Sequence, residues 1–365
     1  MNKTFVRNLT IAFLCFVPVW MFACKDVKFS EKENRNLASV PKLTWSSITG
    51  GRFMDDFETY LTDQFPLRNL CVSIKTAVLR GTGRRYINDV YIGKEGYLIA
   101  KESVADYNRV DRLTESINKF ADNVKGVSVD FLLIPNTSLI YEDKLPYGAK
   151  SNEKEVISHD KVNTIDVTDV LIAKANEGLY YKTDHHWKTK AAYYTFRQYA
   201  AYKGITPVNY NFYDVTGNFQ GTQSSNSGVY STYETVTIGV PDNSIGTYTV
   251  EYVNEGKKTT SLFDDSKLKE KDKYQVFLGG NFAQVDITTT AGTGRNLMII
   301  KDSYANCFIP LLTPYYDKIT VIDPRYFYDD IYTLIEAYGI SDVLFMYNVN
   351  SYVEDNSLED ILSKS

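Results

Sequence analysis

The sequence predicts an α/β protein built around a mainly parallel sheet. Three short apolar runs, residues 296–300, 318–323 and 342–349, alternate with helical stretches toward the carboxyl end of the chain. A fourth run, residues 127–135, comes earlier and is also almost continuously apolar. Strands that are covered by helices on both faces read as unbroken apolar runs, which is typical of a parallel sheet. We therefore expect one sheet with helices on both sides.

The composition is that of a globular protein. The 365 residues are 44% hydrophobic and 23% charged, which suffices for one large domain or for one domain with a satellite. The net charge of −5 argues against a nucleic-acid partner, because phosphate-backbone binding needs clustered Lys and Arg.

The N-terminus has the pattern of a targeting signal. Lys3 and Arg7 precede an uncharged apolar run over residues 9–24. The run is shorter than the ~20 residues that comfortably span a bilayer. Residues 1–25 are therefore predicted to be a signal peptide, a short membrane anchor, or a lipoprotein signal whose Cys24 is lipidated. All three alternatives place the rest of the chain outside the cytoplasm, either secreted or anchored to the membrane.

The remaining chain is predicted to comprise a helical entry segment and one α/β domain. Residues 26–89 hold a polar connector followed by apolar positions at helical spacing. Residues 90–365 form the α/β domain, in which residues 205–290 are richer in Gly, Ser, Thr, Asn and Asp and indicate a β-rich insertion. Only Cys71 and Cys307 follow the N-terminal run, so no disulfide framework is expected.

Shorter elements are also expected within the α/β domain. Residues 90–99 alternate around a glycine turn and predict a hairpin, and a second hairpin is expected to turn at residues 254–256. Residues 163–169 are predicted to be a further strand, and a helix is expected to start at Thr189.

A serine lies where catalytic groups gather in this class of fold. Asp302 and Ser303 occupy the turn after the strand 296–300, and a helix is expected to start at Tyr304. Loops at the carboxyl ends of parallel strands carry the sites of doubly wound proteins, and the first turn of a helix can stabilise an oxyanion. Ser303 is therefore a candidate nucleophile. The alternative is that Asp302 or Ser303 only caps the helix.

The stretch TDHHW supplies a candidate base for that serine. Asp184 and His186 are two residues apart, so in an extended loop their side chains share a side and His185 points the other way. A serine needs a histidine to take its proton, and a carboxylate orients that histidine. Ser303, His186 and Asp184 thus form a candidate triad.

Two alternatives compete with the triad. Asp184, His185 and His186 could bind a metal, but adjacent histidines seldom converge on one ion in an extended loop, so no metal is expected. The histidines could instead be structural, bonded to backbone in a buried turn.

Further candidates for oxyanion or substrate contacts follow from position. Asn136 ends the strand 127–135, Asn281 follows two glycines, and Arg325 ends the strand after the serine strand. The alternatives are an Asn turn, a simple loop, and an ion pair between Arg325 and the acid two residues before it. Trp187 and His185 are candidate contacts beside the base.

Several strings together resemble one family. TDHHW, ENRNLA, DQFPLRN, GKEGYL and IIKDSYANCFIPLL, spread over most of residues 28–350, resemble the bacterial DHHW protein family. That family is similar to the alginate O-acetylation proteins AlgX and AlgJ, whose catalytic domains are SGNH-hydrolase-like. The resemblance implies a three-layer SGNH-like fold, with Asp184 and His186 as acid and base and Ser303 as nucleophile. The relatives' serine turn often reads Thr-Ser-Tyr, whereas Lys301 and Asp302 precede the serine here.

The sequence and the resemblance together imply a function. We expect extracytoplasmic acyl (acetyl) transfer or ester hydrolysis on a cell-envelope or secreted polysaccharide of a bacterium, without a cofactor. The expected partners are a polysaccharide acceptor, an acyl donor and a membrane acyl-export protein. The alternative is a catalytically inactive glycan-binding or scaffold protein with the same fold.

Overall fold

The computed structural model describes residues 3–5, 7–8, 11, 16, 19–20, 23–159, 164–230, 232–242 and 247–363. The predicted signal or anchor at the N-terminus therefore lies largely outside the described residues. Within the described part of the chain, no helix has the length and apolarity needed to cross a bilayer.

A seven-stranded sheet with the order β10-β9-β11-β13-β12-β14-β6 forms the centre of the molecule. The strands are β6 (Ser128–Ile134), β9 (Tyr248–Tyr252), β10 (Lys257–Thr259), β11 (Gln284–Thr289), β12 (Asn296–Lys301), β13 (Lys318–Ile322) and β14 (Asp342–Asn348). Strands β13, β12, β14 and β6 pair in parallel, and β11, β9 and β10 extend the sheet by antiparallel pairing. Within this sheet, β10 and β11 are antiparallel to the other five strands. The predicted α/β class with a mainly parallel sheet is confirmed, as are its four apolar strands.

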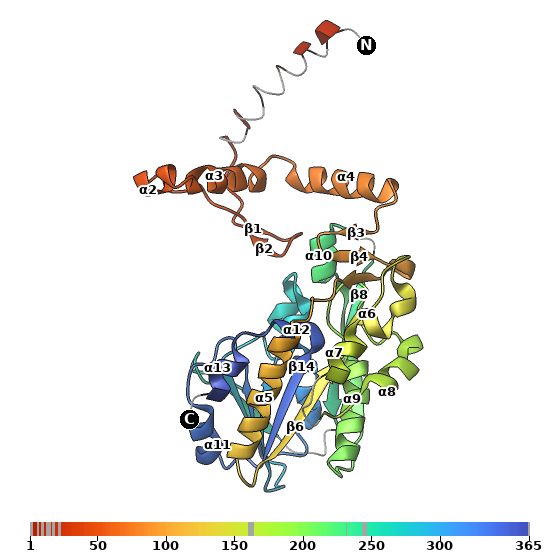
Figure 1. The fold of residues 1–365 in the computed structure, drawn as a ribbon, viewed down its shortest axis with the longest axis vertical. Coiled ribbons are helices and arrows are strands. Elements are labelled where there is room, and N and C mark those ends of the chain that lie inside the picture. Colours follow the sequence, from red (N-terminus) through yellow and green to blue (C-terminus); the bar gives the residue numbers. More distant parts are fainter. Residues whose placement is uncertain are drawn as a thin grey trace.

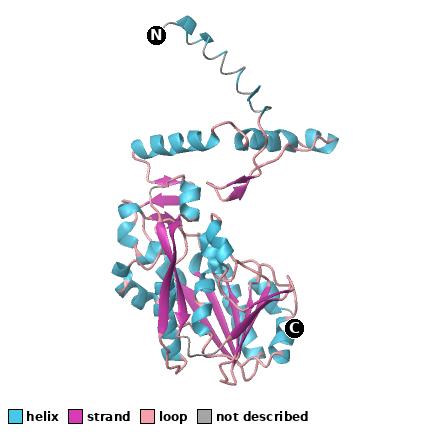
Figure 2. Cartoon of the chain, turned by 180° about the vertical axis from the view of Figure 1, so that it is seen from behind, coloured by secondary structure: helices cyan, strands magenta, loops and turns pink. Residues whose placement is uncertain are grey.

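Alternating side chains of the strands enter two separate cores. On β12, Ile299 belongs to one core and Ile300 to the other, and on β14 Leu344 and Phe345 divide in the same way. The first core is covered by α8 (Thr168–Ala173) and α9 (Thr189–Tyr202). The second is covered by α5 (Tyr107–Asn123), α7 (Glu153–His159), α11 (Ile331–Ala337), α12 (Val349–Glu354) and α13 (Leu358–Ser363). Helices thus lie on both faces of the sheet, as the sequence predicts (Figures 1 and 2).

The N-terminal part is helical, as expected, and lies beyond one end of the sheet (Figure 1). It contains α2 (Trp45–Thr49), α3 (Arg52–Asp63), α4 (Arg68–Gly81) and a short hairpin of β1 (Phe29–Ser30) and β2 (Arg35–Asn36). A three-stranded sheet of β3 (Tyr86–Ile87), β4 (Val90–Ile92) and β5 (Leu98–Ala100) then leads into the main body. The antiparallel pairing of β4 with β5 confirms the hairpin predicted for residues 90–99.

The β-rich region divides into two parts. Strands β7 (Tyr210–Phe219) and β8 (Glu234–Pro241) form a separate ribbon, with α10 (Thr222–Ser227) between them. Strands β9, β10 and β11 instead join the main sheet, so this half of the region extends the sheet. The predicted hairpin at residues 254–256 is confirmed by the pairing of β9 with β10.

The prediction of a strand over residues 163–169 is wrong for residues 164–169, which the structure describes. Thr164 forms one isolated bridge with Phe131. Asp166 then accepts a hydrogen bond from the backbone N–H of Thr168 at 2.8 Å, at the start of α8. Asp and Thr favour such helix starts, and this preference overrides the short apolar alternation.

Candidate active site

Ser303 lies at the carboxyl end of β12, in the turn that leaves the sheet. Asp302 caps this turn, because its Oδ1 accepts a hydrogen bond from Tyr304 N and its Oδ2 accepts one from Asn348 N, both at 2.9 Å. The capping residue is thus Asp302, and the hydroxyl of Ser303 takes no part in the cap. The expected α-helix is instead two 3-10 helices, η6 (Ser303–Cys307) and η7 (Ile309–Leu312). Pro310 lacks the N–H that a continuing α-helix needs.

The three predicted triad residues come together although 117 positions separate His186 from Ser303. Nε2 of His186 lies 2.8 Å from Oγ of Ser303, and Nδ1 of His186 lies 2.6 Å from Oδ1 of Asp184. The same Oδ1 accepts the backbone N–H of His186 at 2.9 Å. Asp184 is 1% exposed and His186 6%, whereas Ser303 is half-buried. A buried acid therefore orients an imidazole whose other nitrogen faces an accessible hydroxyl.

The loop before α10 holds the other oxygen of the acid. The backbone N–H and the hydroxyl of Thr222 donate to Oδ2 of Asp184 at 2.8 and 3.1 Å. Gly221 permits this approach, because a Cβ added there would lie 2.2 Å from both Cβ and Oδ2 of Asp184. Burial raises the pKa of the Asp184 carboxyl, but His185, His186 and the hydrogen bonds outweigh it, so the pKa lies well below its usual range.

His185 does not point away from His186, and this part of the sequence prediction is wrong. The two rings lie 3.9 Å apart between centroids. Thr222 explains the arrangement, because its Oγ1 lies 2.7 Å from Nδ1 of His185. Burial and the neighbouring His186 lower the pKa of His185 to about 4, although Asp184 opposes them. His185 is therefore neutral near pH 7.

The metal alternative has a geometric basis in the same cluster. Ligand atoms of Asp184, His185 and His186 lie within 4.8 Å of one another. Both oxygens of Asp184, both ring nitrogens of His186 and Nδ1 of His185 already have hydrogen-bond partners in the chain. This arrangement favours the triad interpretation over a metal centre.

Aromatic side chains fix the base and the serine turn. The ring of Tyr274 stacks on His186 with 3.7 Å between centroids and 11° between planes. Trp187 is fully buried and its Nε1–H donates to the Tyr304 carbonyl at 2.9 Å. Tyr304 in turn donates its hydroxyl hydrogen to the His185 carbonyl. Trp187 thus ties the histidine loop to the serine turn and is not accessible to a substrate.

Two other candidates for oxyanion or substrate contacts bind acidic side chains of the protein instead. The backbone N–H and the side-chain amide of Asn136 both donate to the carboxylate of Glu153. Arg325 forms the ion pair that was the alternative for it, with Nε and Nη2 at 2.8 and 2.6 Å from the two oxygens of Asp323.

Asn281 lies beside the serine turn. Its Oδ1 accepts hydrogen bonds from Lys301 Nζ at 2.8 Å and from Asn306 Nδ2 at 3.1 Å. Lys301 precedes the serine by two residues and Asn306 follows it by three. These two donors fix the orientation of the Asn281 amide, so its NH₂ group faces away from both of them.

Sequence reasoning missed Gly221, Thr222 and Tyr274. Thr222 lies 38 positions from Asp184, in a stretch rich in Ser and Asn that resembles any polar loop. Tyr274 is one of 29 tyrosines, and nothing in its local sequence distinguishes it. Only the folded chain brings these residues to the histidines.

The fold and the site define a three-layer α/β protein with a Ser-His-Asp constellation at the carboxyl edge of its parallel strands. Residues 149–322 match the family model described as DHHW protein, which confirms the resemblance seen in the sequence. The match includes Asp184, His186 and Ser303. No similar protein was found among proteins with curated descriptions.

Two solved structures show the same fold, with TM-scores above 0.5. A DHHW family protein from Eubacterium siraeum is 27% identical, with a TM-score of 0.62, covering 74% of this chain and 93% of that chain. PatB1 of Bacillus cereus, solved with a sulfonyl adduct, is 16% identical with a TM-score of 0.62, covering 73% and 96%. The O-acetyltransferase domain of Pseudomonas putida AlgJ is more distant, at 10% identity and a TM-score of 0.44, covering 74% and 95%.

Proposed function

We propose that this chain is an extracytoplasmic serine-dependent acyltransferase or esterase that acts on a bacterial polysaccharide. The observation that carries the proposal is the continuous hydrogen-bonded chain from Asp184 through His186 to Ser303, with distances of 2.6 and 2.8 Å. Such a chain has the geometry required of an activated nucleophile. The sequence resemblance to the alginate O-acetylation proteins motivates acetyl as the acyl group, and the apolar N-terminal run motivates the location.

In the proposed reaction, each proton is transferred to or from Nε2 of His186. Nδ1–H of His186 donates to Asp184, which leaves Nε2 free to take the proton of Ser303 Oγ as that oxygen attacks the acyl carbonyl. Nε2 then returns the proton to the leaving oxygen of the donor, and an acyl-serine remains. A sugar hydroxyl, or water, attacks the acyl-serine while Nε2 takes its proton, and the return of that proton to Oγ restores the serine. No cofactor enters these steps.

The surroundings of His186 suit this cycle. Asp184 stays ionised because its pKa is low, so it stabilises the imidazolium that forms during each transfer. Tyr274 lies face to face with His186, and an aromatic face attracts a cation. The neutral His185 adds no competing positive charge. Asn281, whose amide is held beside the serine turn, is the proposed oxyanion donor.

Hydrolysis of an aryl acetate, and acetyl transfer from it to oligosaccharides, tests the proposal on the full-length protein. The Ser303→Ala variant is expected to lose about 10³-fold or more in kcat/KM, because nucleophile and base act as a unit. Ser266→Ala, at an exposed position of helix η4 (Asp265–Lys269), is the matched control and is expected to retain activity. Equal rates for wild type and Ser303→Ala would instead support the inactive glycan-binding or scaffold protein.

A further inference from the structure

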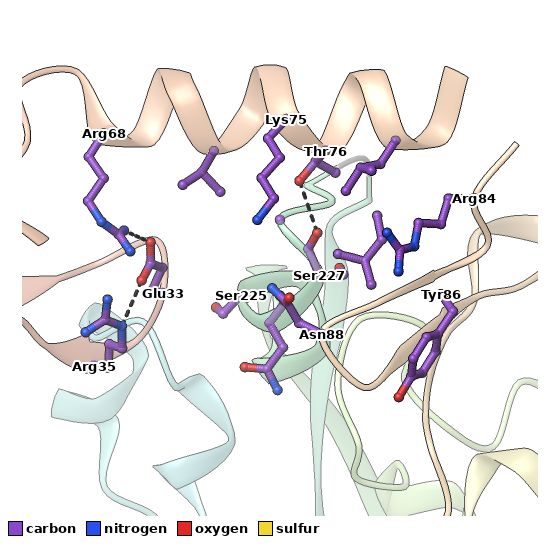
Figure 3. A pocket seen from close by; sticks show the side chains of 15 residues that line it. Glu33, Arg35, Arg68, Lys75, Thr76, Arg84, Tyr86, Asn88, Ser225 and Ser227 are labelled. Atoms are coloured by element: carbon purple, nitrogen blue, oxygen red, sulfur yellow. Dashed lines mark hydrogen bonds and ion pairs between the residues drawn. The ribbon is translucent and has the colours of Figure 1, made fainter. Parts of the chain in front are cut away.

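A second site candidate lies between helix α4 and the α10 loop. This cavity has a volume of about 500 Å³, and Ser303 is not among its lining residues. Volumes of roughly 300 to 1,000 Å³ are typical of small-molecule sites. Figure 3 shows α4 along one side of the cavity and the end of α10 opposite it. The polypeptide around Glu33 and the turn at Asn88 complete the lining.

The charged lining of this cavity is strongly unbalanced. Arg35, Arg68, Lys75 and Arg84 contribute four positive groups, and Glu33 is the acid among the lining residues. Glu33 pairs with both Arg35 and Arg68, and the buried Asp63 pairs with them as well.

Lys75 and Arg84 differ from these arginines. In the part of the chain that the structure describes, neither of them forms an ion pair, and Figure 3 shows Lys75 reaching from α4 into the cavity. A locally positive site on a chain whose net charge is −5 indicates an anionic ligand. Val72, Leu79 and Tyr86 add apolar surface, which suits the rings of a saccharide.

The walls of the cavity are fixed to each other. Thr76 on α4 donates its hydroxyl hydrogen to the Ser227 carbonyl at 3.3 Å, and the Asn88 amide donates to the Asn226 carbonyl at 2.8 Å. Residues 225–228 at the end of α10 line the cavity, while Thr222 at its start holds Asp184. A single short helix therefore connects the cavity with the candidate triad.

Two further positive groups lie against Tyr230, close in sequence to the cavity lining. The ammonium groups of Lys32 and Lys271 each lie 5.5 Å from the centre of the Tyr230 ring. Glu33 and Gly228 line the cavity. Lys32 is the residue before Glu33, and Tyr230 lies two residues after Gly228. Burial lowers the pKa of Lys271, and Asp184 is among the acids whose charge opposes this shift. Lys32 and Lys271 thus add two positive groups around the Tyr230 ring.

We propose that the α4–α10 cavity binds an anionic unit of the polysaccharide on which Ser303 acts, a sugar that carries a carboxylate or a phosphate. Lys75 and Arg84 hold the anionic group, and the polymer passes Tyr230 toward the serine. This inference rests on the proposed function for its polymer, but binding at the cavity is measured without turnover. A site of this kind makes the enzyme selective for charged glycans.

Isothermal titration calorimetry on the full-length Ser303→Ala protein separates binding from catalysis. The probes are an oligouronate, an oligomeric glycerol phosphate and a neutral glucan of similar length. The test variant adds Lys75→Ala and Arg84→Ala. The control variant instead adds Lys119→Ala and Arg197→Ala, which remove the same charge from exposed positions on α5 and α9. Aryl acetate hydrolysis is measured in parallel with Ser303 intact.

We expect one or both anionic oligomers to bind, and to bind more weakly at higher salt. The neutral glucan is not expected to bind. The Lys75 and Arg84 substitutions are expected to weaken that binding about tenfold or more, because charge-assisted hydrogen bonds are lost. The control variant keeps wild-type affinity and wild-type aryl acetate hydrolysis. The anion that binds identifies the carboxylate or the phosphate.

Two results would overturn the inference: no anionic oligomer binds, or the test variant binds as tightly as the control. Absence of ester hydrolysis in the wild type, with binding retained, would instead count against the proposed reaction alone.

Discussion

Gly221→Ala should disable the candidate triad without touching any of its three members. The φ of Gly221 is −84°, so alanine can adopt the backbone conformation and the effect is purely steric. The new Cβ would lie 2.2 Å from Oδ2 of Asp184, whereas non-bonded heavy atoms require roughly 3.5 Å. Either the acid or the α10 loop must therefore move by about 1 Å or more, and a misplacement of about 1 Å costs on the order of 10²-fold in rate.

The assay is kcat/KM for aryl acetate hydrolysis, together with a thermal unfolding curve. Gly217→Ala is the matched control, because the nearest atom to its added Cβ is Thr235 Oγ1 at 4.0 Å. We expect a loss of about 100-fold in Gly221→Ala and almost none in Gly217→Ala. A folded Gly221→Ala protein with wild-type kcat/KM would refute the claim that the position of Asp184 matters for the reaction.

Three further predictions follow from single contacts. Thr222→Val removes the hydroxyl donor to Asp184 but keeps the backbone N–H, so kcat/KM should fall about 10-fold and Thr222→Ser should restore it. Trp187→Phe removes the 2.9 Å donor to the buried Tyr304 carbonyl and leaves it the longer contacts from the Tyr274 hydroxyl at 3.4 Å and the Cys307 thiol at 3.7 Å, so it should cost about 1 kcal/mol in urea unfolding. Burial and Glu102 raise the pKa of Glu153 from 4.5 to about 8, against the hydrogen bonds it accepts, so the folded state holds this proton more tightly than the unfolded state. The wild type should therefore lose about 1.4 kcal/mol of stability per pH unit between these two values, and Glu153→Gln should remove that loss.

The sheet could be predicted from the sequence because its strands are buried on both faces. The runs that form β6, β12, β13 and β14 are almost continuously apolar, and runs of this length between helical stretches are typical of buried parallel strands. The run at residues 163–169 is shorter and contains polar residues at helix-start positions, so local capping determined its structure. The sequence also could not reveal that β9, β10 and β11 would join the main sheet, because strand pairing is a tertiary property.

The candidate triad could be predicted because its three members lie in informative places. Asp184 and His186 are two residues apart in a histidine-poor chain, and Ser303 follows a buried strand. The predicted orientation of His185 is wrong because a loop that is distant in sequence supplies Thr222 as its partner. Trp187 is a plausible substrate contact by its position in the sequence, but its burial can be known only from the fold. Supporting residues carry no local signal, since their role depends on what they approach in space.

Intact-mass spectrometry after treatment with a sulfonyl fluoride measures directly whether His186 activates Ser303. We expect one adduct on the full-length protein, localised to Ser303, that is absent from folded Ser303→Ala and His186→Ala variants and still forms in the Ser266→Ala control. No adduct on the folded wild type, or an adduct that persists in Ser303→Ala, would show that His186 does not activate Ser303.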